Sequence, residues 1–430
     1  MFFCTVHAQS EKPRWPRSAA VQCIALGALL GLLSSPMQAQ GRLVGRWTSA
    51  IAPVYEGWRF GGSGAEQPTA DGASNVRVRE ASQWSFPIGV AVPIGARWLL
   101  DLSGAYASGT VKLASEDSTL TTNEYTLNGL TDVRLRVVGR LAGAPSGNGV
   151  LVTLGLVAPT GKTELEAKEV NALRVLAAPA LGFQVPTLGA GAGATAGVVG
   201  AREIGGWSLA LAASYELRRG YEPGTVATGV PLPELDPSDA VHLSLGADRL
   251  LGGKHGMTVA LSADLFTEDH LRESGSLGGA APVQNDVTTK PGPVYTLDWQ
   301  LQLAPPQGFR ELTLYAVDRY RAEYSRSGQA VAGSGGNYLD LGARSTIRAG
   351  QKMGVLLWLS ARHQTGLDSD RALATASMRS GALTLGLVRE LGAGLSVQPF
   401  VRGQAGTLET GDERTNLTGV AFGISLGRQW

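Results

Sequence analysis

Segments of strictly alternating side chains recur along the chain and constrain its fold more than any other feature. In residues 295–303, YTLDWQLQL, every odd position is apolar and every even position is polar. Residues 207–217, 133–141, 241–248, 259–265 and 339–348 repeat the pattern. Because successive side chains of an extended strand point to opposite faces, each segment predicts a strand with one apolar face. Soluble sandwiches also alternate, so this pattern alone leaves two fold classes open.

The connections between these segments take turns between short and long, and this order separates the two classes. Short turns are expected at 93–97, 142–149, 202–206, 251–255, 305–308, 349–352 and 391–394, and long connections near 61–83, 113–129, 160–190, 219–239, 267–292, 325–336, 366–375 and 407–416. Bacterial outer-membrane barrels place short turns in the periplasm and long loops outside. The sequence therefore predicts an all-β fold, a single transmembrane antiparallel up-and-down β-barrel.

The number of strands follows from counting between the connections. The count gives about 16, with 47–60 as the first strand. A chain that starts and ends in the periplasm needs an even number of strands. If one hairpin is a plug or a loop, 14 is the alternative.

The C-terminal segment has the pattern of a closing strand. In residues 420–430, Phe422, Ile424, Leu426 and Trp430 share one face, and small or polar side chains occupy the other. An aromatic last residue on such a strand resembles the C-terminal recognition signal of Gram-negative outer-membrane proteins. The resemblance implies that the barrel-assembly machinery is a partner through this strand.

The N-terminus reads as a signal peptide. Lys12, Arg14 and Arg17 precede an apolar run over 19–33, and a small residue for cleavage follows in 36–39. The run is too short for a membrane-spanning helix, which needs roughly 20 residues. We expect cleavage near 39–40, so that 1–40 is a signal peptide and 41–430 the barrel; a retained anchor is the alternative. Both cysteines, Cys4 and Cys23, lie in this leader, which leaves the mature chain without a thiol.

Strand parity assigns the two faces of the wall. Leu, Val, Ile and Ala hold the outward positions, and Trp98, Trp207 and Trp430 stand near strand ends where an aromatic belt belongs. Charges facing lipid would each cost about 2–4 kcal/mol near the midplane, so charged positions are assigned to the lumen. These are Asp101, Arg134, Arg136, Arg140, Glu216, Arg218, His242, Asp248, Asp264, Asp298, Glu311, Arg319, Arg321, Glu323, Asp340, Arg344, Arg348, Arg362 and Arg402. Asp318 has the outward parity, which predicts a bulge or an interfacial position.

Motifs of soluble enzymes have weaker support. Residues 423–427, GISLG, match a nucleophile elbow, but an elbow requires a turn and a helix where this chain has a strand near its end. Residues 154–163 have five residues rather than four between Gly155 and Gly161, so they fail the phosphate-loop spacing. The histidines are scattered without metal-ligand spacing, and a net charge of +1 gives no field for nucleic acid. We expect no cofactor, no metal and no nucleic-acid partner.

Three short motifs carry a family resemblance. Residues 158–161, APTG, close an apolar strand; residues 129–134, GLTDVR, precede them, and 188–191, LGAG, follow. Together they resemble the outer-membrane barrels named for the meta-cleavage pathway of phenol degradation, over roughly 80–270. The resemblance implies a relation to fatty-acid and aromatic-hydrocarbon importers, and it supplies no catalytic residues.

The predicted function is passive uptake of small, hydrophobic or aromatic compounds across the outer membrane. Its basis is the apolar loop 175–186, VLAAPALGFQVP, in which Leu176, Leu181, Phe183 and Val185 would form a landing site at the barrel mouth. A loop that only caps the rim is the alternative for this segment. For the protein, the alternatives are a general diffusion pore for small polar solutes, a membrane-embedded hydrolase, and a structural or adhesive surface protein.

Overall fold

The computed structural model describes residues 48–68, 75–115, 122–143, 148–222, 225–227, 230–231, 234–275, 283–366, 373 and 376–429. The expected signal peptide in 1–40, both cysteines and Trp430 lie outside the described residues. Within these ranges, no helix is both long and apolar enough to cross a membrane.

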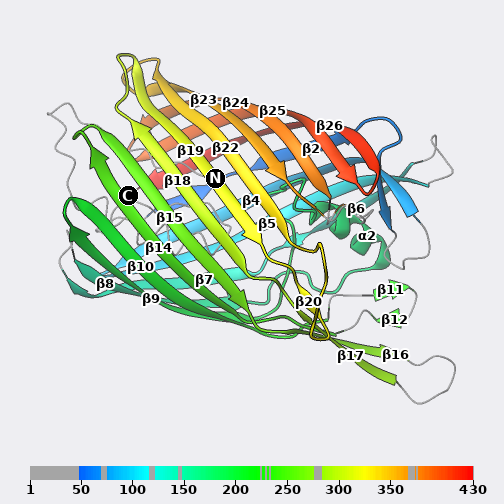
Figure 1. Ribbon diagram of the computed structural model, residues 1–430. Coiled ribbons are helices and arrows are strands. Elements are labelled where there is room, and N and C mark those ends of the chain that lie inside the picture. The colour runs from blue at the N-terminus through cyan, green and yellow to red at the C-terminus, as the bar shows by residue number, and fades with distance from the viewer. Residues whose placement is uncertain are drawn as a thin grey trace.

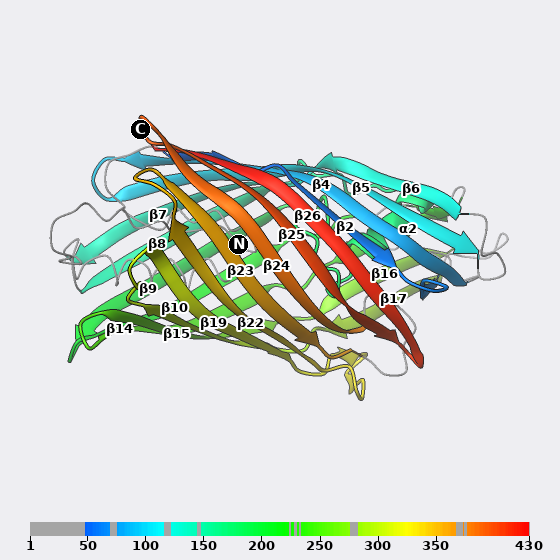
Figure 2. The same cartoon turned by 90° about the horizontal axis from the view of Figure 1, so that it is seen from above.

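One antiparallel sheet closes on itself into a barrel (Figures 1 and 2). Its members, in chain order, are β1 (Thr48–Ile51), β2 (Val54–Phe60), β3 (Ala65–Pro68), β4 (Asn75–Ile94), β5 (Trp98–Ser115), β6 (Thr122–Leu130), β7 (Val133–Gly143), β8 (Gly149–Ala158), β9 (Gly193–Ile204), β10 (Trp207–Arg218), β14 (Ala240–Leu251), β15 (His255–Phe266), β18 (Val294–Leu303), β19 (Phe309–Arg321), β22 (Gly336–Arg348), β23 (Met353–Gln364), β24 (Ser377–Gly392), β25 (Leu395–Thr410) and β26 (Glu413–Gln429).

These 19 segments form 16 barrel strands. β1, β2 and β3 are consecutive pieces of the first strand, because β1 and β2 both pair with β4 and β26, and β3 continues along β4. β6 and β7 are pieces of the fourth, since both pair with β5. The first strand meets the last through Tyr55 opposite Phe422. The predictions of a closed barrel and of 16 strands are confirmed.

The break between β1 and β2 has a local cause. Pro53 has no N–H to donate to the ladder, so pairing stops there and resumes at Val54. The remaining groups are still used: Ala52 N donates to Pro87 O at 3.1 Å, and Ile424 N donates to Pro53 O at 3.1 Å. The chain thus crosses the break without leaving the wall.

The short turns lie where the sequence predicts them. A two-residue turn joins β9 to β10 through Gly205 and Gly206, whose φ angles are +58° and +80°. Two successive positive φ angles match the twist of a two-residue hairpin, and glycine adopts them without a steric penalty.

The expected long connection at 407–416 is wrong. β25 and β26 run through it and are joined by a turn at 411–412. Strand also covers much of the expected connections at 61–83 and 113–129, through β3, β4, β5 and β6. Here the wall is longer than a bilayer requires.

Aromatic and charged side chains on the outer face show where the wall leaves the membrane. Rings of Tyr55, Trp84, Phe86, Tyr106 and Phe422 pack at centroid distances of 5.0–6.1 Å. From Trp98 to Tyr106, strand β5 climbs roughly 20 Å at a tilt of about 40°, which approaches the ~25 Å apolar band of such barrels.

Above these rings the outward side chains become charged. Lys112 contacts Glu80 at 2.8 Å, and Arg59 lies 3.5 Å from the same carboxylate. These three residues occupy outward positions on β5, β4 and β2, farther from the short turns than the rings are. A charged network at that level belongs in water, so the wall projects beyond the bilayer on the side of the long connections.

The long connections build a second small sheet at that end (Figure 1). It contains β13 (Glu234–Asp236), β16 (Asp269–Gly275), β17 (Val283–Lys290), β20 (Ser325–Arg326) and β21 (Gln329–Ala330). β11 (Thr225–Ala227) and β12 (Val230–Pro231) pair separately. Three connections that follow different barrel strands are therefore tied to one another outside the membrane.

Two predictions about the outer face concern Asp318 and the aromatic belt. Asp318 lies outward, opposite Leu297 and Leu339, without a register shift at its position, so the bulge expected there is wrong. Tyr320 is the next outward residue of β19. For Asp318 the other predicted option, a position at the membrane interface, is left. At the opposite end, the Arg249 guanidinium lies 5.1 Å from the Trp207 ring, as expected for an interfacial belt.

The assignment of outer and inner faces predicts that a charge placed on the lipid-facing side will destabilise the barrel. Leu211 lies outward and is 65% exposed. Leu211→Arg should lower the free energy of unfolding in lipid vesicles by about 2–4 kcal/mol, because the charge enters hydrocarbon. Denaturant titration of the refolded barrel measures this. Gln300→Arg, on the inner face of β18, is the matched control and should change stability little; equal losses for both variants would contradict the assignment.

Candidate functional site

The connection between β8 and β9 folds into the barrel instead of extending away from it. We call residues 159–192 the plug segment. It contains the one α-helix of the described chain, α2 (Ala167–Leu176), which packs against the inner faces of β4, β5 and β6. Glu166 and Glu169 form a capping box at its start, and Lys162 binds Glu169 at 2.5 Å. The helix is thus fixed at its N-terminus before its apolar residues begin.

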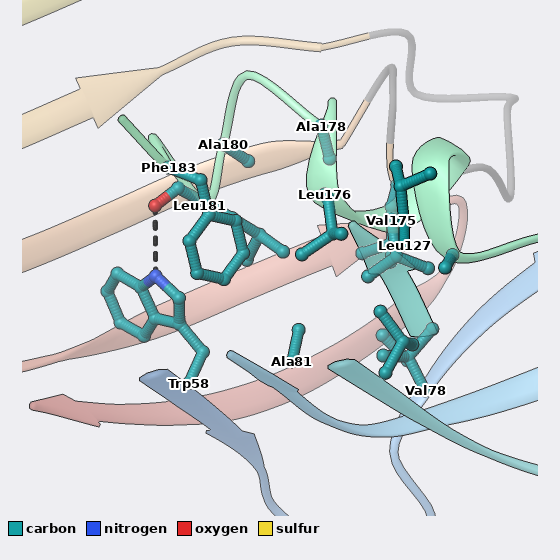
Figure 3. Close-up of a cluster of buried hydrophobic side chains, with 14 of the residues drawn as sticks. Trp58, Val78, Ala81, Leu127, Val175, Leu176, Ala178, Ala180, Leu181 and Phe183 are labelled. Atoms are coloured by element: carbon teal, nitrogen blue, oxygen red, sulfur yellow. Dashed lines mark hydrogen bonds between the residues drawn. The ribbon is translucent and has the colours of Figure 1, made fainter. Parts of the chain in front are cut away.

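The plug segment contributes 11 of the 25 buried residues of an apolar cluster inside the protruding wall (Figure 3). Leu176, Leu181, Phe183 and Val185, the predicted landing-site residues, are 1%, 3%, 6% and 8% exposed. Their partners come from the barrel, and they include Trp58, Val78, Ala81, Val111, Leu127 and Met378. The structure therefore brings all four predicted residues together, packed against the wall rather than open to solvent.

Close approach of the plug to the wall depends on a small residue in β5. A Cβ added at Gly109 would lie 2.3 Å from Cδ1 of Leu176. Real side chains essentially never approach so closely, so a larger residue there would force the Leu176 side chain to move.

Polar side chains of the wall hold the tip of the plug segment. Gln83 makes two hydrogen bonds to Val185, since its Nε2 donates to the backbone oxygen at 2.7 Å and its Oε1 accepts from N at 3.0 Å. Trp58 Nε1 donates to Leu181 O at 2.9 Å (Figure 3). Gln184 N donates to Glu56 at 2.9 Å. These bonds satisfy backbone groups that an inward-folded loop would otherwise bury unpaired.

Asp132 holds both ends of the plug segment, and we call this contact the Asp132 clasp. Its Oδ1 accepts from Gly161 N at 2.8 Å and its Oδ2 accepts from Ala190 N at 2.7 Å. Asp132 N donates in turn to Leu188 O at 3.1 Å. Gly161 must be glycine, because an added Cβ would lie 2.3 Å from the same oxygen.

The clasp unites the three motifs that carried the family resemblance. Asp132 belongs to 129–134, Gly161 to 158–161, and Leu188 with Ala190 to 188–191. Thr160 strengthens the joint, since its Oγ1 accepts from Val133 N at 2.9 Å. The motifs are therefore spatial neighbours at the break between β6 and β7.

Sequence reasoning missed three residues of this site: Trp58, Gln83 and Asp132. Gln83 and Trp58 lie on the inner face, where a polar or aromatic residue raises no conflict with the alternation. For Asp132 a signal was present, namely its place within one of the quoted motifs. Nothing in the strand pattern indicates that the backbone of a distant loop donates hydrogen bonds to this carboxylate.

Below the plug, the inner wall is charged. The register places these predicted lumen-lining residues on the face opposite the exposed leucines: Asp101, Arg134, Arg136, Arg140, Glu216, Asp264, Asp298, Arg319, Arg321, Asp340, Arg344, Arg348, Arg362 and Arg402. The assignment of Glu323 to the lumen wall is wrong, because β19 ends at Arg321 and Glu323 lies in the connection that follows it. Arg136 lies 3.5 Å from Asp101, and Arg344 contacts Glu311. Acidic and basic side chains thus neutralise one another in part across neighbouring strands.

One of these charged groups surrounds His242. Its Nδ1 lies 2.9 Å from Asp264 and its Nε2 lies 3.2 Å from Glu216, which Arg218 also contacts at 3.0 Å. A ring held between two carboxylates is fixed in orientation. Among the described residues, no group of three or more His, Cys, Asp or Glu side chains has the geometry to hold a metal ion.

The enzyme-like motif has no supporting geometry. Ser425 lies in β26, opposite Gln398, within an uninterrupted stretch of pairing. A nucleophile elbow needs a sharp turn at this position.

No protein-family model matches the sequence, and no curated protein sequence matches it either. Among solved structures, the chain is similar to an outer membrane channel from Pseudomonas putida F1, with 10% identity, a TM-score of 0.37, and coverage of 92% of this chain and 99% of that one. It is similar to the CymD monoaromatic hydrocarbon channel, with 9% identity, a TM-score of 0.41, and coverage of 96% and 97%. It is also similar to a TodX monoaromatic hydrocarbon channel mutant, with 10% identity, a TM-score of 0.43, and coverage of 89% and 90%.

The Asp132 clasp predicts a local effect of removing one acceptor. Asp132→Asn offers one acceptor oxygen where two backbone N–H groups need partners, so one of them becomes unpaired at a cost of about 1–3 kcal/mol. Amide hydrogen exchange at Gly161 and Ala190 should accelerate roughly tenfold or more. Asp298→Asn, also on the inner wall, is the matched control and should leave these amides unchanged. Exchange at the wild-type rate in Asp132→Asn would mean that the clasp does not hold the segment.

Proposed function

We propose that the protein is an outer-membrane channel through which small hydrophobic or aromatic compounds pass by diffusion. The observation that carries the proposal is the plug segment, an apolar surface folded into the mouth of a closed 16-strand barrel. Barrels of 16–18 strands enclose a lumen wide enough for an aqueous channel. A purely structural barrel would need neither this width nor an apolar segment inside it.

The plug segment supplies both a barrier and a place for an apolar solute. Leu181 and Phe183 bury their side chains against the wall, while the backbone of 181–185 is held to the wall by the four hydrogen bonds described above. Each such bond contributes about 0.5–1.5 kcal/mol net, so local displacement of the tip is inexpensive compared with opening the barrel. An apolar solute can replace the wall as the partner of these side chains, whereas a polar one cannot.

A general diffusion pore for small polar solutes is the second candidate. The charged inner wall favours it, because facing acids and bases set a transverse field that attracts polar solutes. Conductance in planar bilayers separates the two. Large, steady steps from the wild-type protein support the open pore, and small or absent steps support the plugged channel.

The channel proposal places the protein in contact with outer-membrane lipid and with a small-molecule solute. It includes assembly through the C-terminal strand by the barrel-assembly machinery, with Trp430 as the recognised end. It assigns no catalytic role. A membrane-embedded hydrolase would need a nucleophile with a base beside it, and Ser425 in its strand does not provide that arrangement.

Charge in the apolar cluster tests the plug. In the double variant Leu181→Asp, Phe183→Asp, two carboxylates would have to be buried, so the tip should leave the wall. Single-channel conductance should rise, and uptake of an apolar aromatic such as toluene into proteoliposomes should fall relative to a small polar solute. Leu141→Asn, on the outer face of β7 near the short turns, controls for altered membrane insertion.

Two results would contradict the proposal. Unchanged conductance would mean that the plug segment does not obstruct the lumen. Unchanged uptake of aromatic compounds would mean that Leu181 and Phe183 are not a landing site.

A further inference from the structure

Arginine and aromatic side chains alternate on one stretch of the inner wall, from β19 to β25. We call Arg319, Tyr338, Trp358, Arg362 and Arg402 the arginine–aromatic patch. The Arg319 and Arg362 guanidinium groups lie 5.8 and 5.3 Å from the Tyr338 ring centre, and the Arg402 guanidinium lies 5.6 Å from that of Trp358. Each cation is thus placed beside an aromatic face inside the lumen.

The carboxylate next to the patch, Asp340, already has hydrogen-bond and ion-pair partners. Asp340 accepts hydrogen bonds from Tyr315 at 3.2 Å and from Tyr338 at 3.3 Å, and Arg362 lies 3.7 Å from it. Trp358 Nε1 donates to Tyr315 Oη at 2.9 Å, which fixes the indole against the same network. Asp340 therefore holds the rings in place and has little capacity left to neutralise further arginines.

Two arginines of the patch have no carboxylate in direct contact. Among the described residues, neither Arg319 nor Arg402 has a carboxylate within ion-pair distance. Nε of Arg402 is also buried without a hydrogen-bond partner. Partial burial of a guanidinium without an acceptor is costly, and an incoming anion would supply an acceptor.

The patch adjoins the tip of the plug segment. A Cβ added at Gly182 would lie 2.7 Å from Nη1 of Arg362, so this guanidinium touches the plug between Leu181 and Phe183. Arg402 also lies level with Glu56, which binds Gln184 of the tip, because both residues are opposite Ala421. A solute that displaces the apolar tip therefore meets the arginines next.

We propose that the arginine–aromatic patch is a binding site for aromatic carboxylates. The carboxylate pairs with Arg402 or Arg319, and the ring of the solute lies against Trp358 or Tyr338. The proposal rests on the proposed channel function and narrows its substrate class, from small aromatic compounds in general to those that carry one negative charge.

Uptake into proteoliposomes tests this with three probes: benzoate, benzyl alcohol as its neutral counterpart, and acetate as an anion without a ring. Wild-type protein should admit benzoate faster than either of the others. Arg402→Gln and Arg319→Gln should each reduce the ratio of benzoate to benzyl alcohol uptake about tenfold, the size expected for losing one charge-assisted hydrogen bond. Arg402→Lys keeps the positive charge and should retain most of the wild-type ratio of benzoate to benzyl alcohol uptake. Trp358→Leu should reduce benzoate uptake more than acetate uptake.

Arg348→Gln is the matched control, because Arg348 also faces inward on β22 but lies at its far end and has no aromatic partner in the patch. It should leave all ratios at the wild-type value. If benzyl alcohol and benzoate both fail to enter through the wild-type protein, the proposed channel function fails. If both enter and the ratio does not depend on Arg402 or Arg319, the channel stands and the carboxylate site is refuted.

Discussion

Closure of the backbone hydrogen-bond ladder is the constraint on which the rest of this structure depends. Inside hydrocarbon no water is present to satisfy an exposed N–H or C=O, so a sheet can cross a membrane only if it has no edge. Here the first strand, interrupted by Pro53, still pairs with both β4 and β26 along its pieces. Once the barrel is closed, the alternation of side chains along each strand determines whether a strand residue within the bilayer faces lipid or the lumen.

Above the bilayer the polarity of the two faces of the wall changes. Beyond the rings around Tyr55 and Phe422, the outer face carries Arg59, Glu80 and Lys112, and the inner face becomes apolar to receive the plug segment. The polarity of the two faces is therefore reversed along a single strand. This reversal explains how one sheet can be a membrane wall at one level and half of a water-excluded core at another.

Much of the fold could be predicted from the sequence, because alternation and turn residues are local signals. The 16 strands, the short turns and the inward arginines all follow from them. The strand extensions within 61–83 and 113–129, and through 407–416, could not be predicted in this way, since strands that stand in water need no outward apolar residues and so resemble loops. The partners of the plug could not be predicted either. The apolar character of 175–186 indicated that it would be covered, but contacts such as Gln83 with Val185 join residues about a hundred positions apart, and no period in the sequence encodes them.

The Asp132 clasp has an evolutionary and practical consequence. Since one carboxylate gathers Gly161 and Ala190 side by side, the chain between them leaves and re-enters the wall at nearly the same place. The part of the plug segment between Gly161 and Ala190 can therefore change in length or sequence while β8 and β9 keep their register. Selectivity of the mouth can thus diversify independently of the scaffold that carries it.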